Sequence, residues 1–475
     1  MNFEKHTIDH VEMKPSSSNL SLKLENIRIT TKNDLESLVL AQPQKQGRRS
    51  SVLRRMSVGL QIDPSNDVDS LKKYRIDIHK SETHDDVLSE DSYEDCEKIN
   101  DIPFETSYKG SEYDSELYKR SDSKTDACKI SDFERLRVLG QGAYGKVLLV
   151  RNKRTEMLFA QKELKKASVI ISDKSIERTM SERSILSKIT SHQNIVKLFY
   201  ALHDRSKLYL LMEYIPGGEL FKYLVKEKFL NEQKTSFYII QMSMALKFLH
   251  NLGVIYRDLK PENCMLDKDG YLVLTDFGLA KKSTDEEDSN SKWCNSIIGT
   301  PEYVAPEVLK GENYGNSADW WSLGCVTFDL LTGNPPFTGN NQKKIMDRVI
   351  KEKPKYPFYV TSTSIEVLNK LLNKNPAKRF DVDAEWERFQ KFQFFRHYKF
   401  KDIEARKVTP PIQPIITNPE DAENFDDEFR NMKLSDLDVG GLDIANAREK
   451  ENIDCFAGFS YTATNSFVDN YTLSS

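Results

Sequence analysis

The stretch Gly140-Gln141-Gly142-Ala143-Tyr144-Gly145 decides the fold, because two unrelated architectures use a Gly-x-Gly-x-x-Gly string. In a dinucleotide-binding unit the glycines open a helix. Here they are followed by Lys146-Val147-Leu148-Leu149-Val150, which predicts a strand, and residues 133–139 predict another before them. We therefore expect a glycine loop between antiparallel strands, which excludes the dinucleotide-binding fold. Such a loop can cover a chain of phosphates with its backbone N–H groups, and an ordinary glycine-rich hairpin is the alternative.

The order of the other elements predicts an α+β chain of two lobes. Further strands are expected at residues 158–164, 195–202 and 207–214, and a helix at 174–189. After Gly217-Gly218 the pattern becomes helical, with apolar residues at helical spacing over 235–250 and 318–331. Strands that precede helices indicate a small antiparallel β lobe and a large helical lobe. An irregular tail follows from about residue 396.

The composition excludes several classes of protein. The 475 residues carry 69 Lys and Arg against 73 Asp and Glu, so the net charge of −4 gives no general attraction to nucleic acid or an anionic membrane. We find no run of 18 apolar residues that would span a bilayer, and we expect neither a secretory signal nor a myristoylation site. The six cysteines form no Cys-x-x-Cys pair, which indicates a reducing, intracellular compartment without zinc or disulfides.

The first part of the chain, residues 1–132, is expected to be disordered. Between Ser81 and Asn100 there are eight acidic residues and one lysine, and such a segment cannot bury enough apolar surface to offset chain entropy. A basic stretch at residues 48–57 contains two Arg-Arg-x-Ser strings, which end at Ser51 and Ser57.

Several side chains outside the glycine loop carry chemistry. Lys162 lies in the middle of a predicted strand, which makes sense if it pairs with phosphates and with Glu182 on the next helix. A lysine that extends its ammonium group to water is the alternative. Asp258 and Asn263 stand five residues apart in Tyr256-Arg257-Asp258-Leu259-Lys260-Pro261-Glu262-Asn263. Asp276, in Thr275-Asp276-Phe277-Gly278, ends an apolar strand, where a carboxylate is a good ligand for Mg²⁺.

In this order the motifs, closed by Ala305-Pro306-Glu307, resemble those of the protein kinases. The resemblance implies the two-lobed protein kinase fold with ATP and Mg²⁺. It implies that Asp258 accepts or orients the proton of the substrate hydroxyl, that Lys260 steadies the transferring phosphoryl group, and that Asn263 and Asp276 hold the metal ions. The nucleotide-binding residues that it implies are Leu139, Gly140, Gly142, Gly145, Val147, Ala160, Lys162, Glu182, Met212, Glu213, Met265, Thr275 and Phe425. For Val147 and Met265 plain core packing is the alternative.

Among kinases the chain resembles the AGC group, and within it the TOR-dependent kinases of a ribosomal small-subunit protein. Tyr256 stands where most kinases have histidine, and the closer match is carried by Leu331-Thr332-Gly333-Asn334-Pro335-Pro336-Phe337 and Phe394-Phe395-Arg396-His397. The resemblance implies a disordered regulatory segment at 1–132, a protein kinase domain at 133–395 and an AGC C-terminal domain at 396–475 with a hydrophobic motif. The alternatives are an AGC kinase of another branch with signalling substrates and a pseudokinase scaffold. Intact Lys162, Asp258, Asn263 and Asp276 argue against the scaffold.

The resemblance also implies a preference for arginine upstream of the target serine or threonine. Glu219, Glu262 and Asp329 match the positions that receive those arginines, and a guanidinium can pair with a carboxylate in a planar, bidentate way. The alternatives are that Glu262 only caps the catalytic loop and that Asp329 is solvated.

Two phosphorylation sites are implied. Ser296 stands three residues before Gly299, and we expect Arg257 and Lys281 to lack partners until a phosphate arrives there. Ser460 lies in Phe456-Ala457-Gly458-Phe459-Ser460-Tyr461, whose aromatic residues we expect to dock on the small lobe and fix the Glu182 helix. The alternatives are that Ser296 is one loop serine among several and that the C-terminus is a sticky, disordered tail. No Ser-Pro or Thr-Pro follows Thr409-Pro410, so the group's proline-directed tail site is expected to be either unphosphorylated or absent, with Ser435 as a stand-in.

The expected partners are protein substrates with upstream arginine and the activating kinases that act on Ser296 and Ser460. Ser51 and Ser57 would suit a kinase that prefers basic substrates: this one, a relative, or a cyclic-nucleotide-dependent kinase. An inhibitory segment and a solvated stretch are the alternatives. We expect a monomer in the cytoplasm, with the nucleus as a second location, and no binding to nucleic acid.

Overall fold

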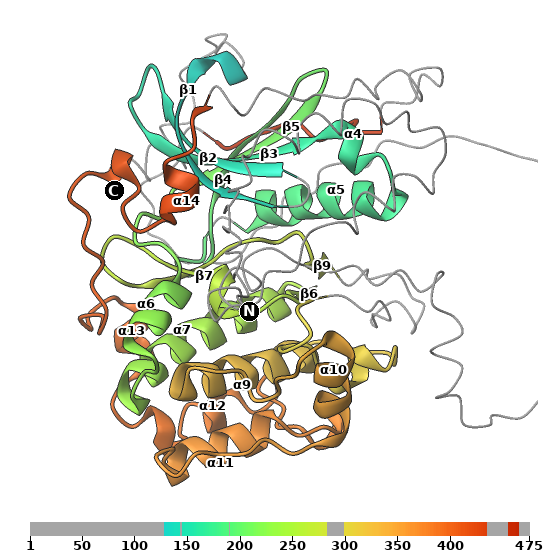
Figure 1. Cartoon of the computed structure of the whole chain (residues 1–475), viewed down its shortest axis with the longest axis vertical. Helices are drawn as coiled ribbons and strands as arrows, with labels where there is room; N and C mark the ends of the chain where they lie inside the picture. The colour runs from blue at the N-terminus through green and yellow to red at the C-terminus, as the bar shows by residue number, and fades with distance from the viewer. Residues whose placement is uncertain (1–127, 143–144, 190, 283–298, 435–454, 465–475) are drawn as a thin grey trace, which may run out of the picture. The chain divides into compact units, whose positions relative to one another are not determined.

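A computed structural model describes residues 128–142, 145–189, 191–282, 299–434 and 455–464 (Figure 1). The predicted segment 1–132 and its sites Ser51 and Ser57 lie almost entirely outside these ranges, as do Ser296 and Ser435. No helix within the described ranges is both long and apolar enough to cross a membrane.

The small lobe is built on one antiparallel sheet with the strand order β1-β2-β3-β5-β4-β10. Its strands are β1 (Phe133–Gln141), β2 (Gly145–Asn152), β3 (Leu158–Lys165), β4 (Leu198–His203), β5 (Lys207–Glu213) and β10 (Tyr461–Thr462). The first five fall where the sequence predicts strands. In β5, the four consecutive residues Leu208, Tyr209, Leu210 and Leu211 are all buried, because side chains on both faces of this strand are covered. The predicted antiparallel β lobe is confirmed.

One long helix covers the sheet. α5 (Asp173–Lys188) follows the short α4 (Lys166–Val169), and only a narrow stripe of it, Thr179, Glu182, Ile185 and Leu186, is buried. This i, i+3 and i+4 spacing places Glu182, alone among the acidic residues of α5, on the inner face.

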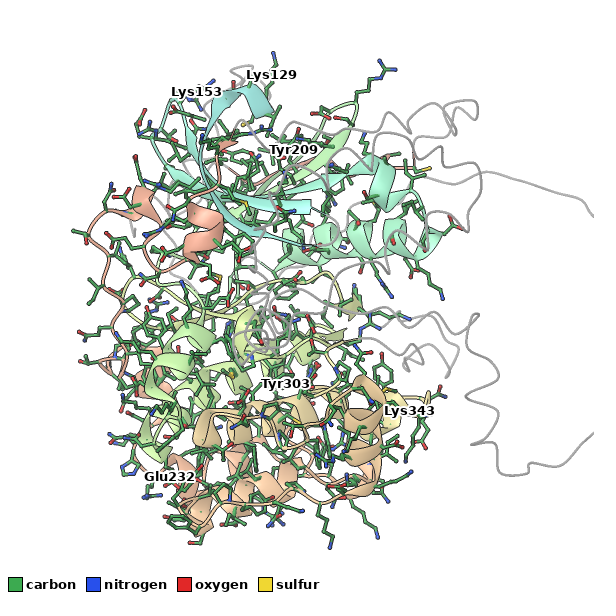
Figure 2. The ribbon with its side chains drawn as sticks, in the orientation of Figure 1. Lys129, Lys153, Tyr209, Glu232, Tyr303 and Lys343 are labelled. Atoms are coloured by element: carbon green, nitrogen blue, oxygen red, sulfur yellow. The ribbon has the colours of Figure 1, made fainter. Side chains whose placement is uncertain are left out.

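The large lobe is helical, as predicted, and is centred on two almost fully buried helices, α7 (Glu232–Asn251) and α9 (Ser317–Thr332). Asn231 caps α7 by accepting a hydrogen bond from the Lys234 N–H, and Gly333 ends α9 in the left-handed conformation at φ 76°. Figure 2 shows Glu232 at the start of α7, where its carboxylate accepts hydrogen bonds from Thr363 and Ser364.

Shorter elements surround these two helices. They are α6 (Leu220–Glu227), α8 (Pro306–Leu309), α10 (Gln342–Lys351), α11 (Ser362–Leu371), α12 (Trp386–Phe389) and α13 (Phe400–Glu404). Two small two-stranded sheets, β6 (Val254–Ile255) with β9 (Lys281–Lys282) and β7 (Cys264–Leu266) with β8 (Leu272–Leu274), hold the loops that face the small lobe. Single 3₁₀ turns occur at Ile130–Asp132, Pro261–Asn263, Pro376–Lys378, Gln393–Phe395 and Pro419–Asp421.

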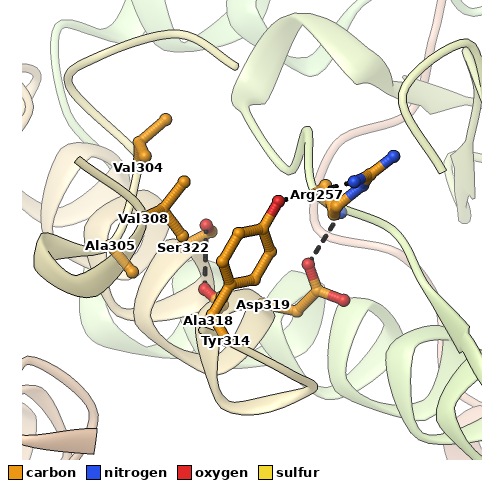
Figure 3. Close-up of a pocket in the computed structure, with 8 residues that line it drawn as sticks. All are labelled: Arg257, Val304, Ala305, Val308, Tyr314, Ala318, Asp319 and Ser322. Atoms are coloured by element: carbon orange, nitrogen blue, oxygen red, sulfur yellow. Dashed lines mark hydrogen bonds between the residues drawn. The ribbon is translucent and has the colours of Figure 1, made fainter. Parts of the chain in front are cut away.

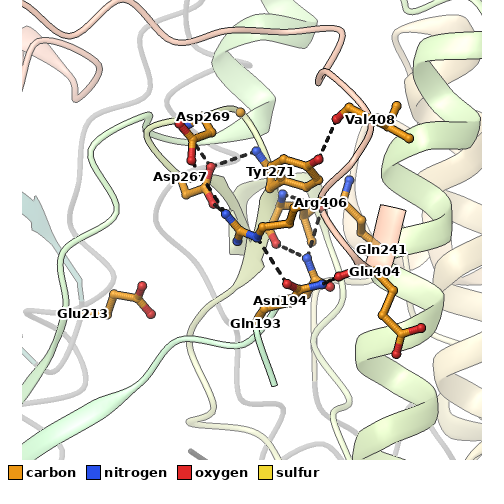
Figure 4. A network of polar contacts seen from close by, with 12 residues as sticks. Gln193, Asn194, Glu213, Gln241, Asp267, Asp269, Tyr271, Glu404, Arg406 and Val408 are labelled. Carbon is orange, nitrogen blue, oxygen red and sulfur yellow. Dashed lines mark hydrogen bonds and ion pairs between the residues drawn. The ribbon is translucent and has the colours of Figure 1, made fainter. Parts of the chain in front are cut away.

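The tail after residue 396 is more ordered than predicted. Arg406 lies over the Tyr271 ring at 4.6 Å and pairs with Asp267 at 2.7 Å, while the Tyr271 hydroxyl donates to the Val408 carbonyl (Figure 4). Further on, α14 (Asp427–Arg430) contacts β1, and β10 joins the sheet beside β4. Hydrophobic periodicity could not reveal these segments because each is held by contacts with distant residues.

Candidate active site

The glycine loop connects β1 and β2, as predicted. Gly140 faces Val147 and Gln141 faces Lys146 in the ladder, and the Gly142 N–H donates to the Gly145 carbonyl at 2.9 Å. A Cβ on Gly145 would lie 1.8 Å from the Glu163 carbonyl of β3, so packing requires glycine there. A Cβ on Gly140 or Gly142 would meet no atom within 4 Å, so packing does not explain those two glycines. The open space beside them fits a ligand that approaches the backbone closely.

Several of the residues expected to bind the nucleotide pack together. Leu139 is buried, and Val147, Ala160 and Phe425 pack beside it in one cluster with Tyr214. Met212 of β5 pairs with Ala160 of β3. Met265 forms an isolated antiparallel β-bridge with Glu219 through the backbone. Thr275 is tied to Asn263 by two hydrogen bonds to its carbonyl, at 3.0 and 3.2 Å. The Glu213 carboxylate pairs with Lys197 at 3.0 Å.

Lys162 joins the two lobes. Its ammonium group donates to Glu182 Oε1 at 2.6 Å and to Asp276 Oδ1 at 3.0 Å. Burial alone would lower the pKa of Lys162, but the charges of Asp276 and Glu182 raise it above its usual range, so the group stays cationic. The alternative of a lysine that points to water is therefore wrong.

Asp258, Lys260 and Asn263 form a second polar cluster. The Lys260 ammonium donates to Asp258 Oδ2 at 2.7 Å, and the Asn263 side-chain amide donates to the same oxygen at 2.8 Å. Burial raises the pKa of Asp258, whereas the Lys260 charge opposes that rise. The other oxygen of Asp258 faces Gly299, whose left-handed φ of 101° only glycine adopts readily.

Asp276 has the environment of a metal ligand. The Lys162 charge lowers the pKa of Asp276 to about 2, and its side chain remains 50% exposed. Its left-handed φ of 54° turns the carboxylate toward Gly278, whose N–H donates to Oδ1 at 3.3 Å. The Asn263 nitrogen is engaged with Asp258, so the amide oxygen is the atom turned to other partners. An ionised carboxylate and an amide oxygen are donors that Mg²⁺ prefers, so this set fits the predicted ion.

Asp319 is a functional residue that the sequence reasoning missed. Its fully buried carboxylate accepts the backbone N–H groups of Tyr256 and Arg257, each at 2.8 Å, and so fixes the two residues before Asp258. Arg257 adopts a left-handed φ of 66°, which explains why its backbone needs such support. Asp-Trp-Trp near the start of a predicted helix was the only signal, and nothing in it shows that the carboxylate points inward.

Tyr256 replaces the usual histidine in a fully buried place. Its hydroxyl donates to the Thr275 carbonyl at 2.5 Å, and its ring lies 5.2 Å from that of Phe277. Burial raises the pKa of Tyr256 well above its usual value, so the hydroxyl remains a donor. The residue therefore links the loop of Asp258 to that of Asp276.

The three acidic residues assigned to substrate lie in different environments. Burial and the neighbouring Glu262 raise the pKa of Glu219 to about 7, and Glu219 Oε2 has no hydrogen-bond partner among the described residues. These two carboxylates therefore share one site that would attract a cation. Asp329 is fully buried and accepts from the Tyr303 hydroxyl at 2.6 Å, so the alternative of a solvated side chain is wrong. Its contact with substrate stays a prediction.

The surroundings of Arg257 correct one expectation. Its guanidinium donates to the Leu279 carbonyl at 2.6 Å and to the Tyr314 hydroxyl at 3.4 Å, so it does not lack partners before phosphorylation. Figure 3 shows Arg257, Tyr314 and Asp319 at one end of a small pocket whose other wall is Val304, Ala305 and Val308. Ser296, the proposed phosphorylation site, lies outside the described residues.

The hydrophobic motif is docked on the small lobe. Phe456 and Phe459 are buried, whereas Ser460 is exposed. Arg183 of α5 donates to the carbonyls of Phe459 and Ser460 at 2.9 and 2.7 Å. Residues 455–464 are therefore not a disordered end, and they contact the helix that carries Glu182.

Comparisons with known proteins agree with this geometry. The profile of the protein kinase domain matches residues 133–389, and that of the protein kinase C terminal domain matches residues 416–461. The serine/threonine-protein kinase YPK3 of Saccharomyces cerevisiae is 44% identical over 401 residues, covering 72% of this chain and 76% of its own length. The serine/threonine-protein kinase Sgk1 is 37% identical over 349 residues in Homo sapiens, covering 73% and 80%. In Bos taurus it is 38% identical over 341 residues, covering 71% and 78%.

Proposed function

We propose that this chain, which belongs to the protein kinase family and is a serine/threonine kinase of the AGC group, acts on particular protein substrates. It phosphorylates serine or threonine residues that are preceded by arginine. The observation that carries the proposal is the joining of Lys162, Glu182 and Asp276 across the lobes. Asp258 belongs to the neighbouring polar cluster, with one carboxylate oxygen held by Lys260 and Asn263 and the other facing Gly299.

The residues of this chain have distinct tasks in the transfer of the γ-phosphoryl group from ATP. Lys162 is held by Glu182 and would pair with the α and β phosphates without first having to be reoriented. Asp258 orients the substrate hydroxyl and accepts its proton. Lys260, bonded to Asp258, supplies positive charge near the oxygen that attacks.

Asn263 and Asp276 are the residues that would hold Mg²⁺. When bound, the ion neutralises charge on the phosphates. The low pKa of Asp276 keeps this carboxylate ionised throughout the physiological range. The Lys162 ammonium donates to Oδ1 of Asp276, so the other carboxylate oxygen would be the one to hold the ion.

The preference for arginine rests on Glu219 and Glu262. Two neighbouring carboxylates raise each other's energy, and Oε2 of Glu219 is buried without a partner among the described residues. A guanidinium that binds there removes the repulsion and supplies planar donors.

The branch of the AGC group decides the physiological substrate. The tail and loop motifs predict the TOR-dependent kinases of a ribosomal protein. The relatives described above carry the names YPK3 and Sgk1, which favour the alternative, another branch with signalling substrates, and we adopt it. Equal activity on an arginine-containing signalling peptide and a ribosomal-tail peptide would argue against either specialisation.

We further propose that Ser296 and Ser460 receive phosphate from upstream kinases, in the cytoplasm and also in the nucleus. The exposure of Ser460 and the proximity of Arg183 to its carbonyl support this role for Ser460. Ser51 and Ser57 each have arginines two and three positions upstream and are therefore candidate substrates of the kinase itself.

The test is phosphate transfer from labelled ATP to an arginine-rich serine peptide by the purified full chain. Wild type should label the peptide, and Asp258→Ala and Asp276→Ala should lose at least a hundredfold in kcat. Asp347→Ala, an exposed aspartate in an i, i+4 pair, is the control and should be unaffected. A wild type that stays silent even after Ser296 and Ser460 are phosphorylated would instead support the scaffold.

A further inference from the structure

A buried histidine lies between two carboxylates beneath the catalytic loop. His250 Nε2 lies 2.8 Å from Asp319 Oδ2, and His250 Nδ1 lies 3.0 Å from Asp383 Oδ2. The His250 side chain is 1% exposed. His250 lies at the end of α7, Asp319 lies in the first turn of α9, and Asp383 lies just before α12. The three residues therefore come from parts of the chain that are far apart in sequence.

This arrangement fixes the protonation of the ring. An ionised carboxylate only accepts hydrogen bonds, so each ring nitrogen that faces one must donate. The ring with both nitrogens protonated is the imidazolium cation, held between two anions. Burial alone would lower the pKa of His250, but hydrogen bonds and charge from Asp319 and Asp383 raise it to about 9.

The other groups around the ring complete the site. The Trp320 indole N–H donates to Asp383 Oδ2 at 2.8 Å, and the Trp320 ring meets the His250 ring edge-on at 5.0 Å. The Lys247 ammonium lies 3.7 Å from Asp383 Oδ1 and donates to the Asp383 carbonyl. Asp383 is therefore anchored independently of His250, and its carboxylate is held in place to accept from the ring.

The bridge reaches the catalytic loop through Asp319. The same Oδ2 that accepts from His250 accepts the Tyr256 N–H, and Oδ1 accepts the Arg257 N–H. Asp258 is the next residue. Arg257 holds a left-handed φ of 66°, so a change in the orientation of Asp319 would be felt directly at Asp258.

We infer that His250 and Asp383 are positioning residues for phosphoryl transfer: the buried imidazolium clamps Asp319, which holds the backbone that aims Asp258. The reaction then slows when His250 loses its proton, because a neutral ring donates from one nitrogen only and faces one carboxylate with a lone pair. The effect on catalysis rests on the role proposed for Asp258. The protonation state expected for His250 is independent of that role.

The first experiment needs no variant. In the full chain labelled with ¹⁵N-histidine, both nitrogens of His250 should give the signature of a protonated imidazolium at pH 7 and should titrate near pH 9. His192, the internal comparison, is also largely buried, but burial and the Lys197 charge lower its pKa to about 4, so it should be neutral at pH 7. A His250 that titrates between pH 6 and 7 would overturn the inference.

The second experiment measures kcat and KM across pH 6–10. Asp383→Asn keeps an acceptor but removes one negative charge, so the alkaline fall in kcat should move at least one pH unit lower, with the KM for ATP within twofold of wild type. Asp383→Glu should return the alkaline fall in kcat, the alkaline limb of the pH profile, to its wild-type pH. His192→Gln should leave this limb where it is in the wild type.

The outcomes separate the possible failures. A uniform loss of kcat at every pH in Asp383→Asn, with no shift of the limb, would show a purely structural role and refute the clamp. If the wild type has no kinase activity but its His250 gives the signature of an imidazolium, the proposed function is refuted instead. If Asp383→Asn does not fold, the titration of His250 in wild type and its fit to the wild-type alkaline limb still decide the matter.

Discussion

Among single residues, Glu219 gives the most direct pH dependence. Burial and the adjacent Glu262 raise its pKa to about 7, so at pH 6 most molecules carry a neutral Glu219, and at pH 8 most carry an anion. An arginine side chain binds only the anion well. The KM for an arginine peptide should therefore fall about tenfold between pH 6 and pH 8. Glu219→Gln should abolish that change and raise the KM at pH 8, as measured by steady-state kinetics.

The KM for ATP serves as the internal control, because the charges that act most on the Glu219 carboxylate are those of Glu262, Lys222, Asp426 and Lys260, and not that of Lys162. A peptide in which lysine replaces arginine should show a weaker dependence, since a lysine ammonium lacks the planar pair of donors. An arginine-peptide KM that stays constant over this range would remove Glu219 from the substrate site.

Sequence reasoning reached some side chains and missed others for a physical reason. Lys162, Asp258, Asn263 and Asp276 lie in local strings whose spacing reports their chemistry, and the structure gathers them. Asp319 could not be found because its role depends on which way it points from a helix buried on all sides. Arg257 was predicted to lack partners, but its partners, Leu279 and Tyr314, become neighbours only on folding.

The glycines of the loop differ in whether the neighbouring strand leaves room for a side chain. Gly145→Ala would place a Cβ 1.8 Å from the β3 backbone, so β2 and β3 must move apart, and we expect a loss of about 1–3 kcal/mol in the free energy of unfolding. Gly142→Ala meets no atom within 4 Å, so its stability should be nearly unchanged while the KM for ATP rises. Thermal unfolding and ATP kinetics on the two variants check this pair. Equal destabilisation would contradict the distinction.

The strand β10 is an element that exists only through its partner. Tyr461 and Thr462 pair with Ala201 and Tyr200 of β4, and Phe459 is buried against the lobe. Two residues have too little local pattern to predict a strand. Phe459→Ala should release this segment, which would appear as faster hydrogen exchange at the paired residues of β4 and faster proteolysis after residue 455. Ala457→Ser, at an exposed position, is the control and should leave both rates unchanged.

Across the whole described molecule the tail is fastened at separate places on both lobes. Arg137 and Arg151 bind Asp421 and Glu420 on the small lobe, whereas Arg406 binds Asp267 and covers Tyr271 on the large lobe. Arg406→Ala should cost about 1 kcal/mol or less in global stability because the pair is partly exposed. It should nevertheless raise hydrogen exchange over residues 404–412, with Lys407→Ala as the control. Unchanged exchange would show that Val408 and its neighbours hold this stretch alone.

The β10 segment has a consequence for the life of the protein in a cell. A sheet ends at an edge whose unpaired N–H and C=O groups invite other chains, and here the tail occupies the edge of β4. A molecule whose tail has left the lobe would therefore present a sticky edge to its neighbours and to the machinery that removes misfolded chains. Losing the docked tail should shorten the half-life of the enzyme as well as silence it, so that idle molecules are also the ones most readily cleared.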